Sequence, residues 1–335
     1  MKTIPLERIP ADSPEAAERV RRAEPFVTSL RWPAHERWTL DYVKQRCGPR
    51  QVIVFRKRDP EPAEKLELPL RDYLDLVAAP DWGSRYELLG VPQTRIWLEG
   101  APDPGLGALL DDLTVPALVD RDRLQSINLW LQGGAYDNGN HYDPNGLHNL
   151  NVQIRGRKRW RLFHPDLGGV LGIEPALADL APPLVSSQTR HPERCGDPPG
   201  GAGAVCLEAV LEPGDAIFVP AFYMHWVVHE SALHVNVNFW WAPRSVPMAG
   251  IPVAWALVNG LISVFRRRMP GATLAEVCAA IAATSAETRE LLLELERALL
   301  TEPELLTPAR AMSLRRGTGD PLPAEGVERK FRDRA

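Results

Sequence analysis

The stretch HYDPNGLHNLNVQIRGRKRW, residues 141–160, decides how the middle of this chain folds. After its first turn, apolar and polar side chains alternate with a period of two residues, which is the pattern of a β-strand. The apolar set is Leu150, Val152 and Ile154; the polar set is Asn149, Asn151 and Gln153. HVNVNFWW, residues 234–241, alternates in the same way. The pattern fits a sheet with one wet face, and it also fits a barrel with a polar lumen whose apolar side chains pack outward against helices or a second sheet.

Short strand-like runs separated by Gly, Pro and Asn fill residues 111–245. They are SINLWLQ, LHNLNVQIR, KRWRLF, DAIFVP, HWVVHE and HVNVNFWW. IRGRKRW predicts a hairpin about Gly156-Arg157. We expect a mainly β fold with flanking helices, built on an antiparallel sandwich or barrel.

The rest of the chain divides into three further zones. Residues 1–110 mix helices and short strands, with helix starts at Ser13-Pro14 and in WTLDYVKQRCG. The sequence of residues 246–312 predicts helices. Their apolar stretches favour a homodimer interface over helices that only pack on the barrel as a lid. Residues 313–335 are polar and predict a disordered tail.

Composition excludes several classes of protein. The 335 residues carry a net charge of −4, so no domain-scale basic excess predicts nucleic-acid binding. The four cysteines are widely spaced, which fits a reducing compartment rather than a disulfide framework. The N-terminus has no secretory h-region, and the apolar run 251–265 is short for a membrane span. We expect a soluble, cytoplasmic protein.

A metal site is suggested by three side chains. His141 and Asp143 are two residues apart, so in extended chain they project to the same side. The segment EPGDAIFVPAFYMHWVVHE brings His225 to the mouth of another strand. Two histidines and one carboxylate hold Fe(II) on one side and leave the opposite positions open. His229 has the parity of His225 but lies about 13 Å further along, so both cannot bind one ion.

These segments together resemble the Jumonji-C, cupin-like oxygenases that use iron(II) and 2-oxoglutarate, and look closest to the branch of the asparaginyl hydroxylase that acts on hypoxia-inducible factor. The resemblance covers about residues 110–243 and implies a double-stranded β-helix, or jelly roll. It rests on NLWLQGGAYDNGNHYD, NLNVQIRGRKRWRLF and EPGDAIFVPAFYMHWV followed by VNVNFWW.

The resemblance also implies residue roles. His141, Asp143 and His225 match the iron ligands, and Lys158 matches the lysine that binds the distal carboxylate of 2-oxoglutarate. Without the resemblance, Lys158 in its basic turn would be read as a surface lysine. The residues that match the lining of the cosubstrate site are Asn149, Asn238 and Asn138, the last of which stands where the family often has a threonine.

The implied reaction hydroxylates an unactivated C–H bond, using O2 and converting 2-oxoglutarate to succinate and CO2. We expect the substrate to be a protein or peptide side chain. A free amino acid or small metabolite is the first alternative, N-methyl demethylation the second and a catalytically silent, cupin-type binding protein the third. We expect no nucleic-acid or membrane partner, and a possible homodimer through the C-terminal helices.

Overall fold

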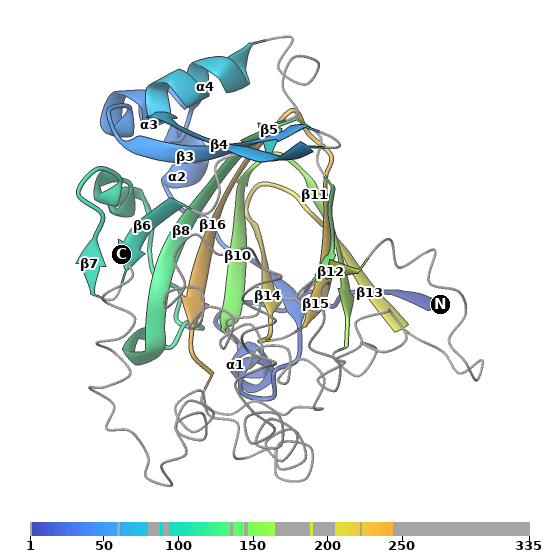
Figure 1. The fold of residues 1–335 in the computed structure, drawn as a ribbon. Helices are drawn as coiled ribbons and strands as arrows, with labels where there is room; N and C mark the ends of the chain where they lie inside the picture. Colours follow the sequence, from blue (N-terminus) through green and yellow to red (C-terminus); the bar gives the residue numbers. More distant parts are fainter. Residues whose placement is uncertain are drawn as a thin grey trace, which may run out of the picture.

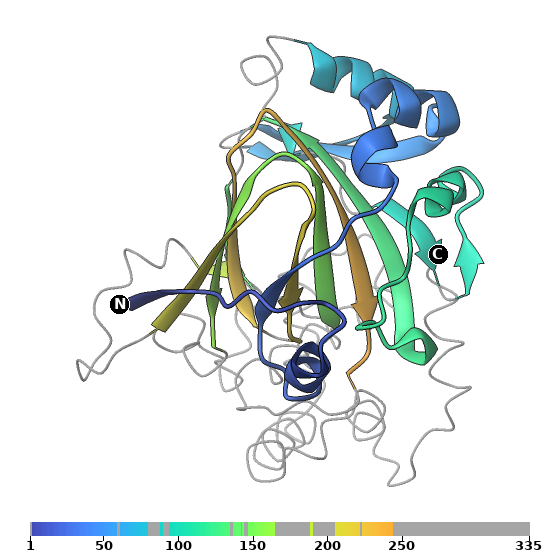
Figure 2. The same ribbon diagram turned by 180° about the vertical axis from the view of Figure 1, so that it is seen from behind.

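Two β-sheets face each other and form the body of the protein (Figures 1 and 2). This computed structural model describes residues 2–58, 61–79, 88–89, 94–98, 100–134, 137–141, 143, 147–164, 188–189, 205–221 and 223–243. The predicted C-terminal helices, their dimer interface, the tail and most of the loop at 181–204 lie outside the described residues. In the part of the chain that is described, no helix is both long and apolar enough to cross a membrane.

The larger sheet has seven strands in the order β2-β14-β10-β16-β8-β6-β7. Their bounds are Phe26–Ser29 (β2), Asp215–Val219 (β14), His148–Arg155 (β10), Leu233–Trp241 (β16), Leu124–Gly133 (β8), Thr94–Leu98 (β6) and Ala101–Pro102 (β7).

The smaller sheet has six strands in the order β1-β13-β11-β15-β9-β12. Their bounds are Lys2–Pro5 (β1), Val205–Leu211 (β13), Lys158–Phe163 (β11), Met224–His229 (β15), Asp137–His141 (β9) and Gln188–Thr189 (β12). A separate three-stranded sheet contains β4 (Glu61–Pro69), β3 (Gln51–Arg58) and β5 (Leu88–Leu89).

From β8 to β11 each strand lies in the opposite sheet from the one before, and the same holds from β13 to β16. This alternation makes the double-stranded β-helix, so the expected jelly-roll fold is confirmed. Strands β1, β2, β6 and β7 come from the first 110 residues yet extend the two barrel sheets. The division into zones at residue 110 stays a prediction.

The predicted hairpin at Gly156 is wrong. β10 pairs with β14 and β16, whereas β11 pairs with β13 and β15, so the turn carries the chain from one sheet to the other. Gly156 has a φ of 81°, and a Cβ on it would lie 2.2 Å from the carbonyl oxygen of Leu233. A crossover turn therefore needs the same glycine as a tight hairpin, and the local sequence does not distinguish the two.

Helices α2, α3 and α4 lie together at one end of the barrel, and α1 lies at the other end (Figure 1). The helices are α1 (Pro14–Arg21), α2 (Ala34–Arg37), α3 (Leu40–Cys47) and α4 (Leu70–Ala78), with 3-10 turns at Gly107–Asp112 and Arg121–Arg123. Ser13 caps α1 and Thr39 caps α3, as their sequences predict. The completely buried Asp112 accepts hydrogen bonds from Arg37, Trp38 and Tyr42, which joins α2 and α3 to the turn at Gly107–Asp112.

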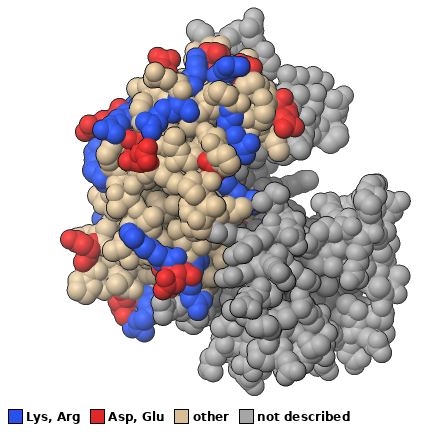
Figure 3. Space-filling model, turned by 90° about the vertical axis from the view of Figure 1, so that its left-hand side faces the viewer, with Lys and Arg blue, Asp and Glu red and all other residues tan. Residues whose placement is uncertain are grey.

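The main apolar core lies outside the barrel lumen. Leu150, Val152, Val237 and Phe239 are completely buried and belong to the same cluster as side chains of α3 and α4. The polar parity of β10 and β16 faces the other sheet. Of the two interpretations of the alternation, the barrel with a polar lumen is therefore confirmed. Charges of both signs are interspersed on the face over α3 and α4 (Figure 3), where Lys44 pairs with Asp75.

Candidate metal and cosubstrate site

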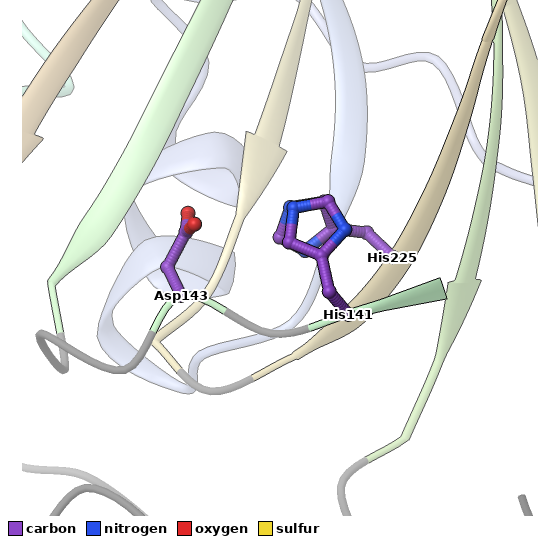
Figure 4. Close-up of side chains that lie close together, drawn as sticks. All are labelled: His141, Asp143 and His225. Carbon is purple, nitrogen blue, oxygen red and sulfur yellow. The ribbon is translucent and has the colours of Figure 1, made fainter. Parts of the chain in front are cut away.

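Three candidate ligands meet at one end of the barrel (Figure 4). His141 ends β9, Asp143 follows it, and His225 is the second residue of β15. In the pairing of β15 with β9, His225 lies directly opposite His141, so both side chains project to the same side. Their ring centroids are 4.3 Å apart, and the ligand atoms of all three residues lie within 4.8 Å of one another. This spacing allows the three to hold one ion.

The backbone and a tryptophan orient His225. Its Nδ1 lies 3.0 Å from the carbonyl oxygen of Tyr223, which can only accept a hydrogen bond. The proton therefore belongs on Nδ1, and Nε2 is left as the metal-binding nitrogen. The indole of Trp160 stacks on the same ring, with centroids 5.7 Å apart and planes 28° apart. A histidine held in one tautomer and one orientation is typical of a metal ligand.

Burial is uneven across the three ligands. His225 is buried, whereas His141 and Asp143 are partly exposed. The competing His229 lies four residues further along β15 than His225, opposite Lys158. It does not belong to the cluster. The cluster thus has a buried wall and an open side, which is the arrangement that a ligand set with free coordination positions requires.

Lys158 lies inside the barrel, not on its surface. Along β11 the side chains of Lys158 and Trp160 are buried, while the neighbouring Arg159 and Arg161 point outward and pair with Glu208. The Lys158 ammonium donates to Oδ1 of Asn236. Burial lowers the pKa of Lys158 to about 7, because little around it stabilises the positive charge. An anionic ligand would supply the missing counter-charge.

The two predicted carboxamides lie side by side in the lumen. Asn238 Nδ2 donates to Asn149 Oδ1 at 3.0 Å, and Asn151 Nδ2 donates to Asn238 Oδ1 at 2.9 Å. Asn236 joins them by donating to Asn238 Oδ1 at 2.6 Å. Asn151 and Asn236 were not among the predicted site residues, although they share the polar parity of β10 and β16 with Asn149 and Asn238.

The predicted residue Asn138 and the buried histidine His148 remain to be placed. Asn138 lies on β9, but its side chain is outside the described residues, so its contact with the cosubstrate stays a prediction. His148 has a structural role, because the backbone N–H of Ala221 donates to its Nδ1 at 3.0 Å. Burial lowers the pKa of His148 to about 3, so this ring is neutral.

Buried polar atoms without hydrogen-bond partners also suggest that the lumen binds an anionic cosubstrate. Within the described residues, several buried polar atoms on the lumen parity of their strands lack a hydrogen-bond partner. Among them are Nε1 of Trp130, Trp160 and Trp240, Oδ1 of Asn151 and Oε1 of Gln153. Indole N–H groups are donors only, so they suit the oxygens of a carboxylate or keto acid. Native proteins leave few such groups unpaired, which supports a ligand in this space.

Comparisons with known proteins agree with this geometry. Among the matching proteins are lysine-specific demethylase JMJ31 of Arabidopsis thaliana, 26% identical over 66% of this chain and 45% of that protein, and lysine-specific demethylase 8 of Danio rerio, 27% identical over 64% and 52%. Jumonji C domain-containing protein 5 of Drosophila melanogaster is 28% identical over 64% and 53%. The chain spans about half the length of these curated relatives.

The family model of the cupin-like domain matches residues 13–246, well over half of the chain. This match and the His-Asp-His cluster bear out the expected cofactor set of Fe(II), 2-oxoglutarate and O2. The matched range begins just before α1 and ends just after β16, so it contains both ends of the lumen. The chain therefore belongs to the cupin-like domain family.

Proposed function

We propose that this protein is an Fe(II)- and 2-oxoglutarate-dependent dioxygenase that hydroxylates an unactivated C–H bond of a protein or peptide side chain. The observation that carries the proposal is the placement of a three-ligand cluster and a buried lysine at opposite ends of one polar lumen. Lys158 lies opposite His229, four residues from His225, so the two levels are about 13 Å apart along β15. We infer that a short dicarboxylate bridges this separation between the lysine and the metal ligands.

Each group in the lumen has a defined task in this reaction. His141, Asp143 and His225 would hold the metal, and Lys158 would neutralise the distal carboxylate of the cosubstrate. When bound, iron and 2-oxoglutarate supply oxygen activation: one oxygen atom of O2 enters succinate as CO2 leaves, and the other enters the substrate as hydroxyl. The partly exposed side of the cluster is where a substrate C–H bond can approach.

The protein or peptide substrate is supported by the names of two relatives, which refer to lysine as their target. It is also supported by the resemblance to the asparaginyl hydroxylase branch in the motifs about His141 and His225. The same names favour N-methyl demethylation as a second candidate. Hydroxylation of an N-methyl group gives an unstable carbinolamine that releases formaldehyde, so both outcomes use the same site.

The first experiment measures succinate formed from 2-oxoglutarate, with and without Fe(II). Asp143→Ala and Lys158→Ala are compared with wild type, and Asp75→Ala and Lys44→Ala, an ion pair on α4 and α3, serve as controls. We expect iron-dependent succinate from wild type and both controls only. No succinate from wild type, with no binding of iron or 2-oxoglutarate, would make the barrel a binding module.

A second experiment separates the two candidate reactions. Peptide pools with and without N-methylated lysine are incubated with the loaded enzyme, and the products are analysed by mass spectrometry. Gain of one oxygen atom in unmethylated peptides supports hydroxylation. Loss of a methyl group with release of formaldehyde would assign the protein to the demethylases.

A further inference from the structure

A continuous chain of hydrogen bonds runs along the lumen wall from the lysine toward the metal end. Lys158 donates to Asn236, Asn236 to Asn238, and Asn238 to Asn149. All four side chains are buried, with 4% or less of their surface exposed. Asn149 is the second residue of β10 and lies six residues after Asp143, so it lies at the end of the lumen that carries the metal ligands.

The chemistry of the lysine determines the direction of this chain. An ammonium has three donors and no acceptor, so the oxygen of Asn236 must face it and the Asn236 amide nitrogen must point away. That nitrogen then faces the oxygen of Asn238, whose nitrogen in turn faces the oxygen of Asn149. Reversing any one amide would place two donors or two acceptors face to face. The Asn149 amide nitrogen is left as a donor at the metal end.

Asn236 links the lysine to this order, and Asn151 supports it by donating to the same oxygen of Asn238. Asn236 is the first acceptor for the buried ammonium and the only described side chain that joins Lys158 to the other carboxamides. The other titratable groups around Lys158 are His229 of β15 and His234 of β16, both buried. Burial and the positive charge of Lys158 lower the pKa of both histidines, to about 4 for His234, so neither supplies a counter-charge.

We propose that Asn236 is a positioning residue for the cosubstrate: it aims the Lys158 ammonium and orients the Asn238 and Asn149 amides so that both ends of the lumen present donors to one dicarboxylate. This inference rests on the proposed function. Asn236 does not need to touch the iron or the reacting C–H bond for this role, because it acts through Lys158 and Asn238.

The test measures the dissociation constant of 2-oxoglutarate with Fe(II) under anaerobic conditions, from the charge-transfer absorption of the complex, at several pH values. Asn236→Asp places a carboxylate beside Lys158 that competes with the cosubstrate, and we expect about 100-fold weaker binding. The new ion pair also raises the pKa of Lys158, so the loss of affinity at high pH moves to higher pH. Asn236→Ser cannot bridge Lys158 and Asn238, and we expect roughly tenfold weaker binding.

Asn128→Ser is the matched control, because Asn128 lies opposite Asn238 on β8 and bonds to Ser126 instead of the chain. We expect binding within about threefold of wild type for this variant. Melting temperature and Mn(II) affinity report a merely structural effect, which would lower both in the Asn236 variants. Asn236→Asp with wild-type affinity and pH profile would overturn the inference alone. Failure of wild type to bind 2-oxoglutarate would overturn the proposed function and the inference with it.

Discussion

The two faces of β10 and β16 are both buried, but one is apolar and the other is polar. On the outer face, Leu150 and Phe239 are 0% exposed and pack in the apolar core; on the inner face, Asn151 and Asn238 are 4% exposed and hydrogen-bond to each other. Burying an apolar side chain stabilises the fold, whereas burying a carboxamide costs free energy unless its hydrogen bonds are replaced. The outer face therefore carries stability, and the inner face is built for a ligand.

The largest effect is expected from removing a candidate metal ligand at the inner face. In Asp143→Ala we expect iron-dependent succinate formation to fall by about 1,000-fold or more, because two histidines alone hold the metal weakly. The melting temperature without metal should stay close to that of wild type, since Asp143 is partly exposed. Metal content measured after dialysis and succinate measured by mass spectrometry check this. Full activity in the variant would remove Asp143 from the ligand set.

The outer face is tested by Phe239→Ala. Loss of a fully buried aromatic ring in the apolar core should lower the free energy of unfolding by about 3–5 kcal/mol. In the variant that remains folded, affinity for 2-oxoglutarate should be nearly unchanged. Denaturant unfolding and a cosubstrate titration below the melting temperature measure the two quantities. A variant that keeps its stability but loses cosubstrate binding would reverse the roles of the two faces.

For Lys158→Met, on the inner face, we expect the opposite of Phe239→Ala: cosubstrate binding is lost and stability is kept. Methionine keeps most of the volume and removes a buried charge, so we expect unfolding stability without cosubstrate to be equal or higher. Affinity for 2-oxoglutarate should fall by about 100-fold, because its distal carboxylate loses its counter-charge. Lys44→Met, on the surface of α3, is the control and should change neither. A destabilised Lys158→Met with normal binding would make this lysine structural.

The smallest expected effect is on proton uptake. Binding of an anion favours charged Lys158, whose pKa is about 7 in the unliganded protein. We expect 2-oxoglutarate binding to take up about one proton at pH 8 and almost none at pH 6. Calorimetry in buffers of different ionisation enthalpy measures this uptake. Equal uptake at both pH values would show that Lys158 does not titrate with the cosubstrate.

The same pKa sets a pH dependence of stability. The folded-state pKa of Lys158 lies below its ordinary value of 10.5, so the unfolded chain binds more protons between about pH 7 and 10.5. The unliganded protein should therefore gain stability from this group as the pH rises through that window. Lys158→Met should lack this contribution, which urea unfolding across the window can measure.

Much of this arrangement follows from the sequence, because strand parity is a local property. The alternation in β10 and β16 predicted which side chains share a face, and the H-x-D pair with His225 predicted the cluster. Sheet partners are not local: the turn at Gly156 has the signature of a hairpin but connects two sheets. The role of Asn236 likewise depends on Lys158 of the other sheet, 78 residues away in the chain. The tautomer of His225 depends on a carbonyl whose direction only the folded backbone defines.

The most direct test of the proposed site is a crystal structure of the protein with Mn(II) in place of iron and with 2-oxoglutarate, prepared without oxygen. We expect the metal on His141, Asp143 and His225, the keto acid end of the cosubstrate on the metal, and its distal carboxylate within hydrogen-bond distance of Lys158 Nζ. A metal held by other residues, or a distal carboxylate that points away from Lys158 with Asn236 still bonded to the ammonium, would contradict this expectation.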